Sequence, residues 1–261
     1  YFRGISILML PVVIVLLIYT LFQPEISNSL TNTSRWIKIP IVGFTFQPST
    51  LAGVILMIYV SRYLAKIKDL EIRFSQSIIP LWIPALLILI LILPANFSTT
   101  AILFFMIILL CYIGGYPKKY LFLLISSALV ILTLFILTAK AYPEVFPNRV
   151  DTWKNRIENF VNKDQNKDNY QIEKAKIAIA TGGIRGLGPG KSVQKNFLPQ
   201  SSSDFIFAII VEEFGLIGGI SILLVYLLLL FRIIIISNKS KTIFGSLLGI
   251  GHIVSLIFLI F

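Results

Sequence analysis

The chain has one cysteine, Cys111, and one histidine, His252. A single cysteine excludes an intramolecular disulfide and a metal site built from thiolates. A zinc or haem centre built on histidine is not expected either, and we expect His252 to be a packed, hydrogen-bonded residue in its apolar segment. Candidate chemistry therefore has to come from other residue types.

Charged residues are also scarce, at 13% of 261 residues, whereas 56% are hydrophobic. A soluble domain of this size is about 25% charged and about 45–50% apolar. The excess lies in long uninterrupted blocks, unlike the alternating segments of a membrane β-barrel. The sequence therefore predicts an all-α, polytopic helical membrane protein. The net charge is +11, and we expect the basic residues behind it to set the membrane topology and to contact lipid phosphates. Nucleic acid is not expected as a partner.

Seven segments approach the roughly 20 apolar residues that a spanning helix needs. They are residues 4–22, 48–66, 78–94, 98–115, 119–140, 204–236 and 243–261. This pattern predicts five spans in residues 1–140, a large extracytoplasmic loop in 141–203, and two spans in 204–261. Between the third and fourth spans, Pro94 breaks the helix, and Asn96 and Thr99 are able to cap the next one. The chain lacks an initiator methionine and ends inside an apolar segment, so we expect a piece of a longer protein.

Basic residues are unevenly divided between the two sets of short loops. One set holds Arg3, Lys66, Lys68, Arg73, Lys118, Lys119, Arg232, Lys239 and Lys241. The opposite set holds only Arg35 and Lys38. Because cytoplasmic loops carry the excess of lysine and arginine, the first set is expected in the cytoplasm. Residues 141–203, and Asp204 directly after them, are then extracytoplasmic.

The long loop contains two helical candidates, near residues 150–160 and 170–183, followed by a glycine-rich stretch. Within that stretch, GLGPGKS (186–192) resembles a phosphate-binding P-loop, but Arg185 stands where the motif needs glycine and no strand precedes it. Two interpretations stay open. The stretch is a flexible turn, or its backbone N–H groups, with Arg185, Lys191 and Lys195, bind a phosphate that is not part of a nucleotide.

Three acids mark the start of the sixth apolar segment: Asp204, Glu212 and Glu213. An acid inside a membrane costs about 2.5–3.5 kcal/mol, so such residues are candidates for function. Asp204 is either a helix N-cap or a general base that the helix dipole keeps ionised. Helical geometry places Glu212 about 12 Å further along and Glu213 on the opposite face, so we expect at least one glutamate to bind another helix, through an arginine or a backbone amide. The Gly215–Gly219 spacing predicts a close helix contact.

Three ordered segments carry a family resemblance. They are RWIKIPIVGFTFQPS (35–49), YQIEKAKIAIATGGIRGLGPGKSVQK (170–195) and LPQSSSDFIFAIIVEEFG (198–215). Together they resemble the SEDS family, the shape, elongation, division and sporulation proteins. The form GPGKSVQK is closer to the division members than to the elongation members. In register, the chain corresponds to the third to ninth of the family's ten helices.

The resemblance implies a peptidoglycan glycosyltransferase that polymerises lipid II at the outer face of the bacterial cytoplasmic membrane, at the division site. Asp204 matches the family's essential aspartate and is the implied general base, with undecaprenyl pyrophosphate as the leaving group. The implied substrate-binding residues are Arg35, Gln47, Arg156, Gln171, Arg185, Lys191, Ser192 and Lys195. Glu212, Glu213 and Gly215 are implied supporting residues, and a divalent cation, Mg²⁺ or Mn²⁺, is left open. The implied partners are a class B penicillin-binding protein and other divisome membrane proteins.

Three positions depart from the family pattern. Thr50 and Gly53 stand where the family usually has a glutamate and a lysine, and Asn96 stands in place of an acid. These departures favour one rival hypothesis, a non-catalytic divisome scaffold. A second rival is a lipid II flippase or other transporter, which would have buried acids on several helices and broken helices near the membrane midplane.

Overall fold

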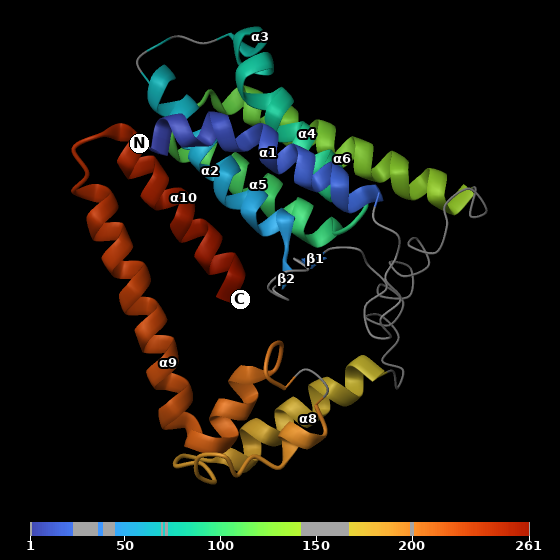
Figure 1. The fold of residues 1–261 in the computed structure, drawn as a ribbon, viewed down its shortest axis with the longest axis vertical. Coiled ribbons are helices and arrows are strands. Elements are labelled where there is room, and N and C mark those ends of the chain that lie inside the picture. The colour runs from blue at the N-terminus through green and yellow to red at the C-terminus, as the bar shows by residue number, and fades with distance from the viewer. Residues whose placement is uncertain are drawn as a thin grey trace. The chain divides into compact units, whose positions relative to one another are not determined.

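The computed structural model describes residues 2–22, 36–38, 45–68, 70, 73–141, 167–198 and 201–260. Their contacts divide the chain into two compact units, one of Tyr1–Ala128 with Phe231–Phe261 and one of Leu129–Leu230. The described residues are almost entirely helical (Figure 1). A helix, in one case continued by others, covers each of the seven apolar segments, which confirms the predicted fold class.

The first unit contains most of the helices. Their bounds are α1 Phe2–Phe22, α2 Pro48–Ile67, α3 Phe74–Ser77, the π-helical turn η1 Ile78–Trp82, α4 Ile83–Ile92, α5 Phe97–Ile113, α6 Lys118–Ala141, which continues into the second unit after Ala128, and α10 Ile243–Ile260. Two short strands, β1 (Ile37–Lys38) and β2 (Thr45–Phe46), pair antiparallel before α2. By length and hydropathy, α1, α2, the continuous α3–η1–α4 helix and α9 (Ile206–Asn238) are able to cross a bilayer, while Phe97–Ile113 and Ile243–Leu256 are shorter apolar helices.

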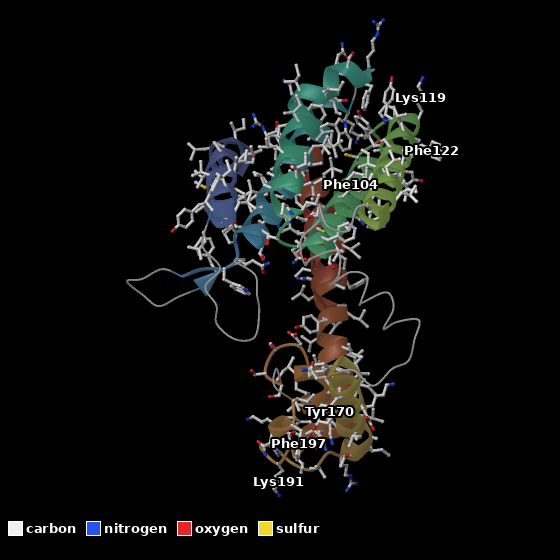
Figure 2. The ribbon with its side chains drawn as sticks, turned by 90° about the vertical axis from the view of Figure 1, so that its right-hand side faces the viewer. Phe104, Lys119, Phe122, Tyr170, Lys191 and Phe197 are labelled. Carbon is white, nitrogen blue, oxygen red and sulfur yellow. The ribbon has the colours of Figure 1, made fainter. Side chains whose placement is uncertain are left out.

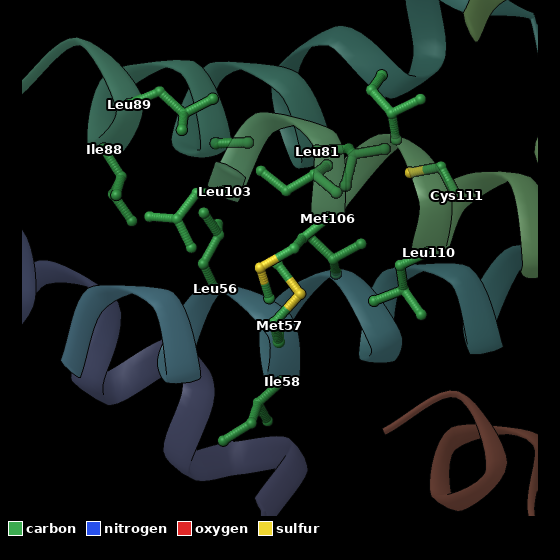
Figure 3. Close-up of a cluster of buried hydrophobic side chains, with 14 of the residues drawn as sticks. Leu56, Met57, Ile58, Leu81, Ile88, Leu89, Leu103, Met106, Leu110 and Cys111 are labelled. Atoms are coloured by element: carbon green, nitrogen blue, oxygen red, sulfur yellow. The ribbon is translucent and has the colours of Figure 1, made fainter. Parts of the chain in front are cut away.

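Helix α2 is the centre of the first unit, because it contacts α1, α4, α5, α10 and η1. Leu56 and Met57 of α2 are fully buried and lie in one cluster with Leu103 and Met106 of α5 (Figure 3). Cys111 is buried in the same cluster. Dense apolar packing of this kind stabilises the unit through many small dispersion contacts.

The π-helical turn η1 follows from two prolines, Pro80 and Pro84, at a spacing of four. Pro84 has no N–H to donate to the carbonyl of Pro80, so that carbonyl needs another donor. The hydroxyl of Tyr59 on α2 donates to it at 2.5 Å. The irregular turn is thereby attached to the central helix.

The family departures have structural roles in this unit. A Cβ on Gly53 would lie 3.0 Å from Cδ2 of Leu103, so a lysine there would have to displace α5 packing. Asn96 accepts a hydrogen bond from the N–H of Thr99 at 3.3 Å, which confirms the predicted helix cap. Thr50 Oγ1 donates to Oε1 of Gln47 at 3.4 Å.

His252 lies half-buried on α10, and its Nδ1 donates to the carbonyl of Leu248 at 2.9 Å. This contact confirms that the single histidine is a packed, hydrogen-bonded residue.

The second unit consists of the end of α6, helix α8 (Lys167–Gly182), the 3-10 turn η3 (Gln194–Asn196) and most of α9. Helix α8 confirms the helical candidate predicted at 170–183. The candidate at 150–160 lies outside the described residues. Helix α9 begins at Ile206, two residues later than the sequence predicts, so Asp204 precedes the helix and stands in the turn 201–205.

Candidate functional site

Helix α9 is broken at Gly215, where the backbone has φ 69° and ψ −171°. A break in a helix leaves N–H and C=O groups without their usual intrahelical partners. The N–H of Leu216 donates to the carbonyl of Gly183 at 2.9 Å, and that of Ile217 donates to the carbonyl of Ile184 at 3.4 Å. The loop after α8 therefore satisfies the donors on one side of the break.

The same loop satisfies the acceptors on the other side of the break. The N–H groups of Leu187 and Gly188 donate to the carbonyls of Glu212 and Glu213, each at 2.9 Å. This is a backbone-to-backbone attachment of loop 183–188 to α9, and it does not depend on side-chain chemistry. Figure 1 shows α8 and the beginning of α9 next to each other in this unit.

Glycine is required where the loop and the helix touch. A Cβ on Gly215 would overlap the carbonyl of Ile184, and one on Gly182 would overlap the carbonyl of Val211. The predicted helix contact of Gly215 and Gly219 is wrong in this respect. Gly215 packs on a loop, and a Cβ on Gly219 would meet side chains of its own helix.

Glu212 is fully buried, with 0% of its surface exposed. Both of its carboxylate oxygens accept hydrogen bonds from the segment that follows the glycine-rich loop. Ser192 Oγ donates to Oε2, the N–H of Val193 donates to Oε1 at 3.2 Å, and the N–H of Gln194 is shared between the two oxygens at 3.3 Å each. Glu212 thus binds backbone amides, but the predicted partner, another helix, is wrong, because the amides belong to the segment after the glycine-rich loop. Glu213 is only half-buried.

The backbone N–H groups of the glycine-rich loop are largely used by the protein itself. Besides the contacts to α9 and Glu212, the N–H of Lys191 donates to the carbonyl of Gly188 at 3.2 Å, and that of Lys195 donates to Ser192 Oγ at 3.1 Å. The carboxylate of Glu212 thus accepts the N–H groups that directly follow the glycine-rich stretch. Exposed cationic side chains are the other groups that this loop offers to a phosphate.

The cationic side chains predicted for that role are exposed. Arg185, Lys191 and Lys195 all lie on the surface of the second unit, and Figure 2 shows Lys191 projecting from it. Within the described part of the chain, no carboxylate forms an ion pair with any of the three. Their charges are therefore available to an anionic ligand.

Asp204 is exposed in the turn 201–205 that precedes α9. Two of the first N–H groups there bond to backbone carbonyls, since Ile206 donates to the carbonyl of Ser203 at 3.4 Å and Ile209 to that of Phe205 at 3.2 Å. No hydrogen bond or ion pair joins the Asp204 carboxylate to another described residue. The N-cap interpretation is therefore not what the structure shows.

The remaining predicted residues lie on other elements or outside the described residues. Gln171 is half-buried on α8 in the second unit, and Gln47 is half-buried at the start of α2 in the first. Arg35 and Arg156 lie outside the described residues. The structure therefore assembles Glu212, Ser192 and the neighbouring cations into one site around the start of α9.

Sequence reasoning missed the role of Lys174 on α8. Its Nζ lies 5.3 Å from the ring centre of Tyr170 and 5.2 Å from that of Phe197, which joins α8 to the end of the loop by cation–π contacts. Figure 2 labels both rings. Tyr170 and Lys174 are one helical turn apart, and this spacing could have suggested the contact between them but not the contact with Phe197. The sequence also gave no sign of Gln194, whose Oε1 is buried without a hydrogen-bond partner.

In the ranges that the structure describes, no three side chains of His, Cys, Asp or Glu gather in a way that could hold a metal ion. Asp204 is the exposed carboxylate at the site, and it supplies a single ligand. A divalent cation therefore stays a prediction.

The long apolar helices and their packing define a polytopic α-helical membrane protein. The chain belongs to the FtsW/RodA/SpoVE family of cell cycle proteins, whose family model matches residues 1–261. This match confirms the resemblance drawn from the three sequence segments.

Relatives and solved structures agree with the family. A probable peptidoglycan glycosyltransferase FtsW of Marinomonas mediterranea is 34% identical over 242 residues, covering 91% of this chain and 55% of the relative. One of Lactococcus lactis subsp. lactis is 34% identical over 268 residues, covering 92% and 62%. The chain thus spans a little over half the length of these relatives.

Two structures share the fold. A chain from work described as structural coordination of polymerization and crosslinking by a peptidoglycan synthase complex has a TM-score of 0.65 at 19% identity, covering 98% of this chain and 68% of that chain. The rod shape determining protein RodA of Thermus thermophilus has a TM-score of 0.59 at 17% identity, covering 99% and 64%.

Proposed function

We propose that the protein is a peptidoglycan glycosyltransferase that polymerises lipid II at the outer face of the cytoplasmic membrane during cell division. The observation that carries this proposal is the exposed Asp204 carboxylate, which no described residue engages, at the start of a helix tied to a cation-bearing loop. The names of the family relatives support the same reaction class.

In the proposed reaction, Asp204 takes the proton from the 4-hydroxyl of one sugar. The oxygen of that hydroxyl forms a bond to the anomeric carbon of a second glycan, and the bond from this carbon to the pyrophosphate breaks. Undecaprenyl pyrophosphate leaves with the electron pair. A positioned base contributes about 10²–10⁴-fold to such a step.

Negative charge grows on the pyrophosphate as its bond breaks, and fixed cations nearby lower the energy of that transition state. Arg185, Lys191 and Lys195 are the proposed cations, since their side chains are exposed and free of described carboxylates. Arg35, Gln47, Arg156 and Gln171 are kept as proposed contacts to the glycan or lipid. A divalent cation that assists the pyrophosphate also remains part of the proposal.

The proposed partner is a class B penicillin-binding protein that cross-links the new glycan, together with other membrane proteins of the division machinery. Support comes from the fold shared with a chain of a peptidoglycan synthase complex described as coordinating polymerization and crosslinking. Location at the division site is proposed from the relatives, which carry the name FtsW.

The transporter hypothesis gains one observation, the break of α9 at Gly215. In transporters, broken helices expose backbone groups to ions or substrate. Here the freed groups of Leu216, Ile217, Glu212 and Glu213 are paired with the loop after α8. The break therefore serves loop attachment, and the glycosyltransferase remains the better-supported function.

The experiment is polymerisation of labelled lipid II by the full-length protein with its penicillin-binding partner, comparing wild type with Asp204→Asn. Glycan ladders from wild type and none from Asp204→Asn are expected, with both proteins folded by thermal unfolding in detergent. Ladders from both would refute the base role, and ladders from neither would favour the scaffold.

A further inference from the structure

The burial of Glu212 needs an explanation beyond the stability of α9. A buried carboxylate is costly unless hydrogen bonds compensate for its lost hydration. The backbone of α9 at this point is already satisfied, because the Glu212 carbonyl accepts from Leu187. An apolar residue could fill the same space without that cost, so the carboxylate itself must have a use.

The partners of the carboxylate identify that use. Its donors among the described residues, Ser192 Oγ and the N–H groups of Val193 and Gln194, belong to consecutive residues of one loop segment. Ser192 Oγ in turn accepts from the N–H of Lys195 at 3.1 Å. One carboxylate therefore holds the backbone of residues 192–195, directly or through Ser192.

Lys191 and Lys195 flank the residues that are held. Their side chains are exposed, while the backbone between them is fixed to α9. A lysine is a flexible point charge, so the position of its backbone decides which region the ammonium group can reach. Through these hydrogen bonds, Glu212 attaches the backbone next to two cations to α9, the helix that Asp204 precedes. Glu212 lies six residues, or about 9 Å of helix, after Ile206, where α9 begins.

We propose that Glu212 is a positioning residue that holds Lys191 and Lys195 where they bind the pyrophosphate of the leaving group. This inference rests on the proposed glycosyl transfer and adds the means by which its cations are placed. Glu213 is the natural comparison. It is the next residue of the same helix, is half-buried, and its side chain makes no hydrogen bond with another described residue.

The test measures binding of undecaprenyl pyrophosphate to the full-length protein with its penicillin-binding partner. Glu212→Gln is expected to weaken binding about tenfold, since it disturbs hydrogen bonds made to a charged group. Ser192→Ala removes one donor, keeps the charge, and is expected to weaken binding to a smaller extent. Glu213→Gln is expected to change binding less than Ser192→Ala, although it removes the same charge as Glu212→Gln.

A double-mutant cycle separates positioning from a general structural role. If Glu212 acts through the lysines, Glu212→Gln should weaken binding by less than about twofold once Lys191→Ala and Lys195→Ala are present. Additive losses would overturn the proposal, as would unchanged binding in Glu212→Gln.

Failure of the proposed function has a different signature. Asp204→Asn is expected to bind undecaprenyl pyrophosphate as wild type does while losing polymerisation. If Asp204→Asn loses polymerisation and Glu212→Gln binds normally, only the positioning role is wrong. If wild type neither polymerises lipid II nor binds undecaprenyl pyrophosphate, the glycosyltransferase is wrong and the positioning role is overturned with it.

Discussion

Each of the two units of this protein is stabilised internally by a different kind of interaction. The first has an apolar core centred on α2, with most of its fully buried side chains aliphatic or sulfur-containing. In its described residues, the second has few buried apolar side chains, including Ala178, Leu198 and Val211, and it depends on hydrogen bonds between the loop and α9. Packing energy is spread over many atoms, so no single contact decides it. Directional hydrogen bonds to a broken helix and to one carboxylate are sensitive to small changes in geometry. They define the positions of nearby charged groups more narrowly than apolar packing does.

The largest effect on stability is expected at the helix break. Gly215→Ala puts a Cβ on a residue with φ 69° and onto the carbonyl of Ile184. Each penalty alone costs on the order of 1–3 kcal/mol, so together we expect about 3 kcal/mol or more. Limited proteolysis of residues 183–205 should become much faster, while the first unit stays resistant.

Gly190→Ala is the matched control, because Gly190 also has positive φ, 75°, but a Cβ there meets nothing within 4 Å. It should cost only about 1 kcal/mol. Equal proteolysis of the two variants would show that the contact between the loop and α9 is not what orders the second unit.

The next effect tests the packed unit. Leu56→Ala leaves a cavity beside fully buried neighbours and should cost about 2 kcal/mol, at the lower end of the usual range because lipid rather than water surrounds the unfolded helices. Thermal unfolding in detergent measures the loss. Leu51→Ala, on the same helix with 39% of Leu51 exposed, should change the unfolding temperature much less. The proposed difference between the units would be wrong if Leu56→Ala increased the protease sensitivity of the loop in the second unit more than that of the first unit.

The smallest effect concerns a polar contact within the packed unit. Asn96→Ala removes the cap on α5 and should lower stability by about 1 kcal/mol. Asn96→Asp keeps an acceptor for the N–H of Thr99 and restores the acid found in the family. Thermal unfolding should show Asp close to wild type, and a loss as large as for Ala would contradict the capping role.

The sequence predicted the parts of the fold that depend on long apolar runs. Helices α1, α2 and α5 lie within about two residues of their predicted bounds because length and hydropathy determine a span. The π-helical turn at Pro80 was not predicted, although both prolines are visible in the sequence, because their spacing does not show that Tyr59 of another helix supplies a donor to the Pro80 carbonyl.

The candidate site was predicted in its residues more than in its geometry. At least one of the two glutamates was expected to bind another helix, whereas Glu212 binds the amides of a loop, because the spacing of acids on one helix does not show which segment faces them. Gly215 was interpreted as a helix contact, because a GxxxG spacing on its own does not distinguish close packing from a break. Tertiary partners decided both cases.

The central claim, that Asp204 is the base of a glycosyl transfer, is tested most directly by a single-turnover measurement. The full-length protein with its penicillin-binding partner is loaded with labelled lipid II, and formation of the first glycosidic bond is timed. If Asp204 is the general base, Asp204→Asn is expected to lower the rate of first-bond formation by at least about 100-fold. Lipid II binding and the unfolding temperature are expected to stay unchanged. A rate in Asp204→Asn within about threefold of wild type would contradict the role of Asp204 as the base, because this loss is much smaller than the contribution of a general base.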